Sequence, residues 1–263
     1  MANNAQAQTV EDGHAVRMAF LEHLRELRDR SIRAFLAIAV GTIIGFFLAE
    51  PVLRILQEPF CRIVGDPLDC RFQVLDPTGN IMVYFRVALL VGGILSIPLV
   101  TYQVMAFVVP GLTKRERSII FLSLPAITLL FVLGVIFSWY VLIPPALTFL
   151  NGFLSNLFQP EWTADGYLSF TTSLIFWMGV AFEAPLVFFV LSVLGIVTPR
   201  GLINNWRLAI VGASVAAALI TPTIDPVNMF LVMGPLLTLY LISIFLTFIG
   251  IRINRGKSIS DKS

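Results

Sequence analysis

The chain has 263 residues, of which 57% are hydrophobic and 13% charged, and its mean hydropathy is +0.86. Because a soluble domain carries about twice that share of charged residues, this composition excludes a soluble enzyme, a disordered chain and a disulfide scaffold. The net charge of +2 says little by itself, since a nucleic-acid-binding protein gathers its basic residues on one folded face, and no nucleic-acid partner is expected.

Six apolar stretches are long enough, or nearly so, to cross a bilayer as helices. A hydrocarbon core of about 30 Å requires roughly 20 helical residues. Backbone groups in lipid must be hydrogen-bonded within the segment, which favours helices over strands. The predicted fold class is therefore an all-α integral membrane protein with six transmembrane helices. The predicted spans are 32–49, 79–109, 118–142, 168–196, 208–221 and 228–250.

The fifth and sixth of these spans are predicted to be short. Residues 208–221 cover 14 positions, which is about 21 Å of helix. Pro235 follows Gly234 in the sixth span and is expected to kink it and shorten its reach. A short span must thin the bilayer, tilt less or pack against its neighbours.

Basic residues are distributed unevenly between the segments that flank these spans. Fourteen lie in the N-terminal arm, two connecting loops and the C-terminal tail, and three lie in the remaining loops. By the positive-inside rule, both termini are expected in the cytoplasm. The expected organisation is a cytoplasmic arm with an amphipathic helix (1–31), a membrane domain (32–250) and a cytoplasmic tail (251–263), with inner loops 110–117 and 197–207 and outer loops 50–78, 143–167 and 222–227.

The two long outer loops are rich in Pro, Gly, Asp and Asn and should form the bulk of an outer cap. Both cysteines, Cys61 and Cys70, lie in the first of them. An oxidising compartment favours a disulfide between them. The alternative is two unpaired thiols.

The residues that catalysis requires are missing from the spans. Both histidines, His14 and His23, lie in the N-terminal arm, and the sequence has no HExxH, CxxC or GxSxG motif. Residues 212–215 approach an intramembrane serine-protease pattern but have no histidine to act as base. No phosphate-binding loop of the required spacing is present. The sequence therefore predicts no enzymatic activity, no cofactor and no metal site.

Two carboxylates at the predicted cytoplasmic face are candidate binding groups. Glu26 lies in the amphipathic arm, where it is either a surface salt-bridge partner of Arg30 or a ligand for a cation. Glu116 stands among Lys114, Arg115 and Arg117. Two carboxylates on separate elements can each hold a guanidinium bidentately, and a lysine lacks that geometry.

A third carboxylate, Glu183, lies about midway along the fourth span. An ionised carboxylate there costs several kcal/mol, so it is expected to be neutral, paired or directed to a polar interior. The structural interpretation is a hydrogen bond to Thr221 or Gln103, and the functional one is a binding site. A secondary transporter or channel that uses Glu183 as a proton or cation site is the alternative function, although the sequence shows no inverted repeat.

Two further features are interpreted as structural. Arg86 lies near the outer end of the second span, where its side chain can extend to the headgroups. Gly41 and Gly45 form a GxxxG motif in the first span, which permits close helix packing within the chain or with a partner. We favour packing within the chain.

These motifs together resemble the TatC family. Residues 23–30, HLRELRDR, resemble its HLxELRxR signature, and residues 103–117 resemble its second-loop motif. Residues 182–185, FEAP, match its fourth-helix acid, and 221–226 its last outer loop. The resemblance covers residues 18–253 and leaves the cysteine pair outside the family pattern.

The resemblance implies a cup-like six-helix receptor that is the large subunit of the twin-arginine translocase, which exports folded proteins across an energised cytoplasmic (inner) membrane without a cofactor. By residue matching, it implies that Glu26 and Glu116 bind the paired arginines of a signal peptide, with Arg28 and Phe107 around them. Glu183 would contact small single-span subunits of the TatA/TatB type. Membrane lipid and self-association complete the expected partners.

Overall fold

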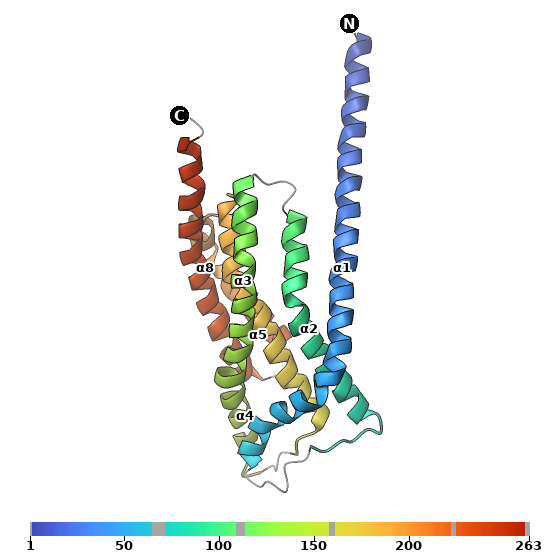
Figure 1. Ribbon diagram of the computed structural model, residues 1–263. Coiled ribbons are helices and arrows are strands. Elements are labelled where there is room, and N and C mark those ends of the chain that lie inside the picture. The colour runs from blue at the N-terminus through green and yellow to red at the C-terminus, as the bar shows by residue number, and fades with distance from the viewer. Residues whose placement is uncertain (1, 65–71, 109–113, 158–160, 222–224, 261–263) are drawn as a thin grey trace.

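The computed structural model describes the backbone of residues 2–64, 72–108, 114–157, 161–221 and 225–260. It describes the side chains of residues 22–62, 72–107, 124–157, 161–221 and 225–252. The elements in chain order are α1 (Ala2–Val64), α2 (Gly79–Val108), α3 (Lys114–Phe137), the π-helix η2 (Ser138–Leu142), α4 (Ile143–Gly152), α5 (Ala164–Val193), α6 (Pro199–Asn204), α7 (Trp206–Ile220) and α8 (Pro226–Ser260) (Figure 1). The predicted all-α fold is confirmed.

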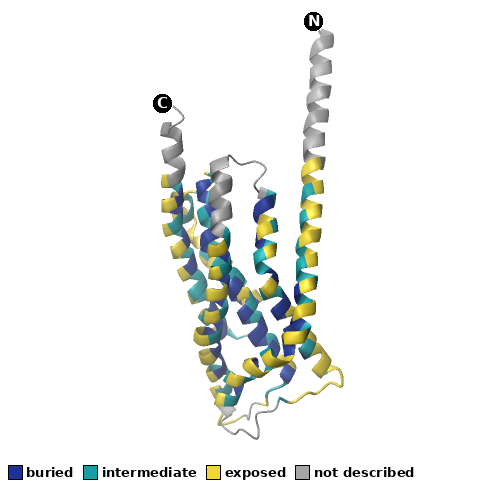
Figure 2. Ribbon diagram, viewed as in Figure 1, coloured by how far each residue is buried: buried dark blue, intermediate teal, exposed yellow. Residues whose placement is uncertain are grey.

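Five stretches of the described helices are long and apolar enough to cross a membrane, and α7 is a shorter apolar helix. Large apolar side chains remain exposed along them, as on Phe47 (81%) and Leu219 (79%). Figure 2 shows exposed residues following the outward faces of the helices over much of the bundle. Such faces are stable in contact with lipid tails, so the chain is a multi-pass membrane protein.

The N-terminal end of α1 and the C-terminal end of α8 lie at the same end of the bundle (Figure 1). We call this the terminal end and the other the distal end. A chain that crosses a membrane an even number of times has both of its termini on the same side. The placement of both termini in the cytoplasm stays a prediction that rests on the distribution of basic residues.

The distal end differs from the expected outer loops. α1 continues through Pro51 and Pro59 to Val64, whereas a loop was expected from residue 50. A proline removes one helical hydrogen bond and bends a helix without ending it when neighbouring residues pack well. Leu56 and Phe60 supply that packing, since they are 3% and 5% exposed. In Figure 1 the last part of α1 turns across the distal end of the bundle.

The third span also continues beyond its predicted end at residue 142. The turn over Ser138–Leu142 is a π-helix, and α4 follows it directly over Ile143–Gly152, where the second outer loop was expected. Pro144 lies in the first turn of α4. A proline is accommodated there because its fixed φ matches the backbone of the first turn of a helix.

The expected shortening applies to the fifth span and not to the sixth. α7 has 15 residues, but α8 has 35 and passes through Pro235 without a break. The Thr238 hydroxyl donates to the carbonyl oxygen of Gly234 at 3.0 Å, next to the proline. Such side-chain bonds help to accommodate a proline within a membrane helix.

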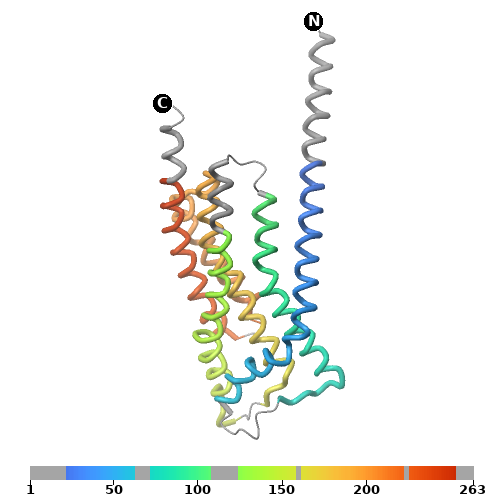
Figure 3. The backbone as a smooth tube through the Cα atoms, viewed as in Figure 1, coloured from blue at the N-terminus to red at the C-terminus, as the bar shows by residue number. Residues whose placement is uncertain are grey.

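The GxxxG motif packs α1 against α2, whose traces run side by side in Figure 3. A Cβ atom on Gly41 would lie 2.6 Å from the carbonyl oxygen of Gly92, and one on Gly45 would collide with the carbonyl oxygen of Ala88. The expectation of packing within the chain is confirmed. The close approach also lets the Tyr84 hydroxyl donate to the carbonyl oxygen of Phe46 at 2.5 Å.

Two segments that precede α2 and α5 are joined at the distal end. The amide of Gln73 donates to the carbonyl oxygen of Trp162 at 3.2 Å, and the amide of Ala164 donates back to Gln73 at 2.9 Å. Beside this bridge, the rings of Phe60 and Phe72 lie 4.5 Å apart and those of Phe72 and Tyr167 4.8 Å apart. The segments therefore enclose a small aromatic core.

Candidate functional site

The first candidate site lies where α1 meets the last turn of α2, at the terminal end. The imidazole of His23 on α1 stacks on the ring of Phe107, with centroids 4.4 Å apart and an interplanar angle of 22°. Phe107 lies one residue before the end of α2 at Val108. The stack therefore holds α1 against the C-terminal end of α2. It thereby positions the carboxylate one helical turn further along α1.

That carboxylate is Glu26, and it already holds a guanidinium. Its Oε1 accepts hydrogen bonds from Nε and Nη2 of Arg30, at 2.9 and 2.6 Å. Its Oε2 lies 4.0 Å from Nδ1 of His23. The Glu26 side chain is 28% exposed and that of Arg30 is 21% exposed. The expected Glu26–Arg30 salt bridge is thus present, and Oε2 is not bound by Arg30.

Glu116 falls in the first turn of α3, which begins at Lys114. Its side chain lies outside the described residues, as does the connection 109–113 between α2 and α3. The backbone nevertheless places Glu116 shortly after the helix end that carries Phe107. A carboxylate in the first turn of a helix is favoured by the partial positive charge of the helix N-terminus.

Arg28 does not join Glu26. Its Nε and Nη2 donate to Oδ1 of Asp29 at 2.9 and 2.8 Å, and its side chain is 68% exposed. Residues two apart on a helix do not face each other, which explains the separation. Among the predicted site residues with described side chains, Glu26 and Phe107 are both linked to His23, while Arg28 stands apart.

Glu183, the second candidate site, lies on α5 ten residues before its end at Val193. Its Oε1 is buried and accepts no hydrogen bond from any described residue. The hydroxyl of Thr221 donates instead to the carbonyl oxygen of Ala217 at 2.8 Å, and Oε1 of Gln103 is also buried and unpaired. Neither of the two expected internal partners therefore bonds to this carboxylate.

An acceptor left without a partner in an apolar environment is destabilising by about 1–3 kcal/mol. A donor from another molecule at Glu183 removes that cost. Within the described side chains, no group of three His, Cys, Asp or Glu residues is arranged to hold a metal ion. A carboxylate oxygen that no described group binds can accept a hydrogen bond from a cationic or neutral donor side chain.

Arg86 has a partner that the sequence interpretation missed. Its Nη1 donates to Oδ1 of Asp165 at 2.6 Å and to the carbonyl oxygen of the same residue at 3.1 Å. Asp165 lies in the first turn of α5, 79 residues further along the chain. The side chain is thus held by an ion pair between α2 and α5.

The His23–Phe107 stack was also missed. Both residues lie in motifs that the sequence singles out, but their contact depends on how α1 packs against α2 and has no local signal.

Cys61 is disulfide-bonded and lies in the last turn of α1. Cys70, its expected partner, lies outside the described residues, so the pairing of the two stays a prediction.

The chain matches the family model described as TatC, Sec-independent protein translocase protein, over residues 22–235. It is similar to proteins of that name from Koribacter versatilis, at 37% identity over 241 residues (91% of this chain, 89% of the relative), and from Aquifex aeolicus, at 37% over 231 residues (87% and 94%). A chloroplastic relative from Oryza sativa is 35% identical over 224 residues (85% and 61%).

The fold is similar to that of a solved protein. A crystal structure described as the twin-arginine translocase receptor TatC superposes with a TM-score of 0.78 at 36% identity, covering 87% of this chain and 99% of that one. A second crystal structure of that receptor, in DDM, gives the same TM-score at 37% identity and covers 86% and 99%. The residues matched by the family model, 22–235, include Glu26, Glu116 and Glu183.

Proposed function

Because the chain belongs to the TatC family of Sec-independent protein translocase proteins, we propose that it binds the paired arginines of a signal peptide through Glu26 and Glu116. A receptor subunit of a protein translocase is a transport component and not an enzyme, and the similarity to the twin-arginine translocase receptor TatC extends over most of the chain. The alternative of a small-solute transporter or channel is not favoured by these relatives.

The observation that carries this proposal is the way in which Glu26 holds Arg30. Two guanidinium nitrogens donate to one carboxylate oxygen at 2.6 and 2.9 Å. The half-buried carboxylate is thus already placed to receive a planar guanidinium. A second guanidinium, from a peptide, can bind Oε2 or take the place of Arg30. Each such charge-assisted bond contributes about 1.5–3 kcal/mol.

Phe107 supports the proposal because its contact with His23 keeps Glu26 near the C-terminal end of α2. Glu116 lies in the chain shortly after that helix end. Each of two adjacent arginines in an extended peptide would then bind one of these two acids. Lysine cannot reproduce this binding, because its single ammonium does not form the two parallel bonds of a guanidinium. Arg28 contributes positive charge around the site, and its pairing with Asp29 limits repulsion of the incoming arginines.

The test is photocrosslinking of a twin-arginine peptide to membranes that contain the protein. We expect Glu26→Gln and Glu116→Gln each to weaken binding by about tenfold or more, and the double variant to abolish crosslinks. Glu22→Gln, an exposed acid one turn before Glu26, is the matched control and should leave crosslinks unchanged. Undiminished crosslinks in the double variant, or equal crosslinks to a twin-lysine peptide, would refute the proposal.

The remaining partners follow from the second site and the family. Glu183 would contact a small single-span subunit of the TatA/TatB type, whose polar group would satisfy the unpaired Oε1. Folded proteins that carry the signal peptide are the cargo, and lipid and further copies of this chain complete the assembly. The protein would lie in the cytoplasmic (inner) membrane with both termini in the cytoplasm, as the distribution of basic residues indicates.

A further inference from the structure

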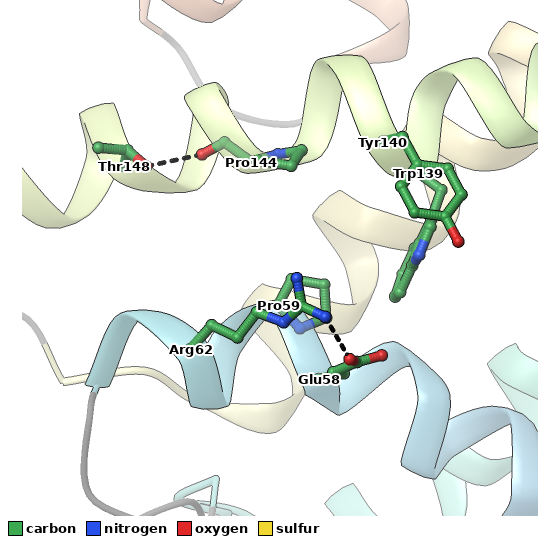
Figure 4. A pocket seen from close by; sticks show the side chains of 7 residues that line it. All are labelled: Glu58, Pro59, Arg62, Trp139, Tyr140, Pro144 and Thr148. Atoms are coloured by element: carbon green, nitrogen blue, oxygen red, sulfur yellow. Dashed lines mark hydrogen bonds and ion pairs between the residues drawn. The ribbon is translucent and has the colours of Figure 1, made fainter.

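Two cavities adjoin at the distal end of the bundle, far from Glu26. They share the walls formed by Trp139 and Tyr140. One, which we call the polar cavity because Glu58 and Arg62 line it, lies between the last part of α1 and the segment formed by η2 and the first part of α4 (Figure 4). The other is apolar and lies between α1, α2, α5 and the junction of α3 with η2. Neither contains a residue assigned to signal-peptide or subunit binding.

The apolar cavity has a volume of about 430 Å³, within the range of roughly 300–1,000 Å³ that is typical of small-molecule sites. Its lining has no charged side chain. Three of the lining residues, Ile55, Leu95 and Ile136, are 45–56% exposed, so the cavity is open along membrane-spanning segments. Its chemistry and position suit a hydrocarbon chain.

The polar cavity has a volume of about 220 Å³ and contains one cation and one anion. Nη2 of Arg62 lies 2.5 Å from Oε1 of Glu58, and these side chains are 76% and 53% exposed. Figure 4 shows this pair on α1 facing Trp139 and Tyr140 on the opposite helix. The cavity therefore offers a guanidinium and a carboxylate side by side and carries no net charge.

The two aromatic residues at the junction lie in the π-helix Ser138–Leu142. Such turns are rare and occur frequently at functional sites. Tyr140 is 72% exposed although it is large and aromatic. Trp and Tyr rings favour the boundary between hydrocarbon and headgroups, and both rings line the two cavities where these meet.

We propose that the joined cavities bind one molecule of phosphatidylethanolamine, with an acyl chain in the apolar cavity. Its phosphate accepts hydrogen bonds from Arg62, and its ammonium donates to Glu58. A guanidinium matches phosphate geometry, and a primary ammonium has three donors for a carboxylate. Phosphatidylcholine has no N–H to donate, and phosphatidylglycerol leaves Glu58 facing a negative charge.

The experiment measures lipid retained by the purified full-length protein after reconstitution in equal parts of the three phospholipids, by native mass spectrometry. The variants are Arg62→Gln, Glu58→Gln and Leu95→Trp, which fills the apolar cavity. Arg54→Gln is the control for the charged pair, because Arg54 forms the same four-residue ion pair with Glu50, at 2.8 Å on the same helix but outside the cavity lining.

Leu99→Trp is the control for the apolar cavity. Leu99 lies on α2, as Leu95 does, and is 56% exposed, but it is outside the cavity lining.

We expect the unaltered protein to retain phosphatidylethanolamine above the other two lipids. Arg62→Gln should lower retention about tenfold, as expected for loss of a charge-assisted hydrogen bond. Glu58→Gln should reduce the preference for phosphatidylethanolamine over phosphatidylcholine, Leu95→Trp should lower retention of all three lipids, and the two controls should match the unaltered protein.

Thermal unfolding of each variant confirms that lipid loss does not reflect loss of the fold. Equal retention by Arg62→Gln and Arg54→Gln, or no preference among the three lipids, would overturn the proposal. The proposal would also be overturned if a photocrosslinker placed at position 95 captured a signal peptide while the amount of bound lipid stayed the same, because the cavity would then hold the peptide and the lipid would be bound elsewhere. Because the readout is lipid, its failure would leave the assignment of Glu26 and Glu116 untouched.

Discussion

The imidazole of His23 lies on the ring of Phe107, with centroids 4.4 Å apart and planes inclined by 22°. This contact joins the arm that carries Glu26 to the end of the helix that precedes Glu116. The placement of Glu26 against the end of α2 therefore depends in part on an aromatic contact that does not contain Glu26 itself.

Replacing Phe107 with Ala should weaken binding of a twin-arginine peptide by about two- to tenfold, since aromatic pairs contribute about 0.5–1.5 kcal/mol. Phe107→Tyr keeps the stacked ring and should keep the affinity. Titration of a fluorescent peptide against the protein in lipid nanodiscs measures both. Unchanged affinity in Phe107→Ala would show that the stack does not position Glu26.

Arg30→Gln should raise the affinity for the same peptide, by up to about tenfold at low salt. The substitution removes the guanidinium that occupies Oε1 of Glu26, at 2.6 Å in the structure, and thereby a competitor of the peptide. Arg33→Gln, on the same helix, controls for the loss of one positive charge. A loss of affinity as large as that of Glu26→Gln would show that Arg30 orients the carboxylate and does not compete for it.

Glu183→Gln should leave the stability of the isolated protein unchanged or higher, because Oε1 has no described hydrogen bond to lose. The same change should reduce co-purification of small single-span subunits. Gln103→Met is the control, since its Oε1 is likewise buried and unpaired but is not assigned to a partner. A fall in unfolding free energy of more than about 2 kcal/mol in Glu183→Gln would instead indicate an internal hydrogen bond.

Gly45→Ala should lower the unfolding free energy by roughly 1–3 kcal/mol, because the added methyl group meets the backbone of α2 at Ala88. Gly212→Ala is the matched control, as a Cβ there has nothing within 4 Å. It should be neutral or stabilising by up to about 1 kcal/mol through helix propensity. Unfolding in mixed denaturing detergent measures both, and equal values for the two variants would contradict a tight α1–α2 contact.

Hydropathy was sufficient to locate the membrane helices, because the cost of placing a segment in lipid is close to a sum over its own residues. The same local reasoning failed at the distal end. Outer loops were expected from residues 50 and 143, but α1 continues to Val64 with Leu56 packed in the core, and α4 begins at Ile143 with a proline in its first turn.

Local sequence was enough to predict the membrane class, the apolar helices, the packing role of Gly41 and Gly45, and which carboxylates stand out chemically. What surrounds those carboxylates on other helices required the three-dimensional fold: Phe107 of α2 stacks on His23 beside Glu26, and Oε1 of Glu183 has no described donor. Side-chain pairing depends on distances and orientations between helices far apart in the chain. Those are set by the fit of whole helix surfaces, which local composition does not encode.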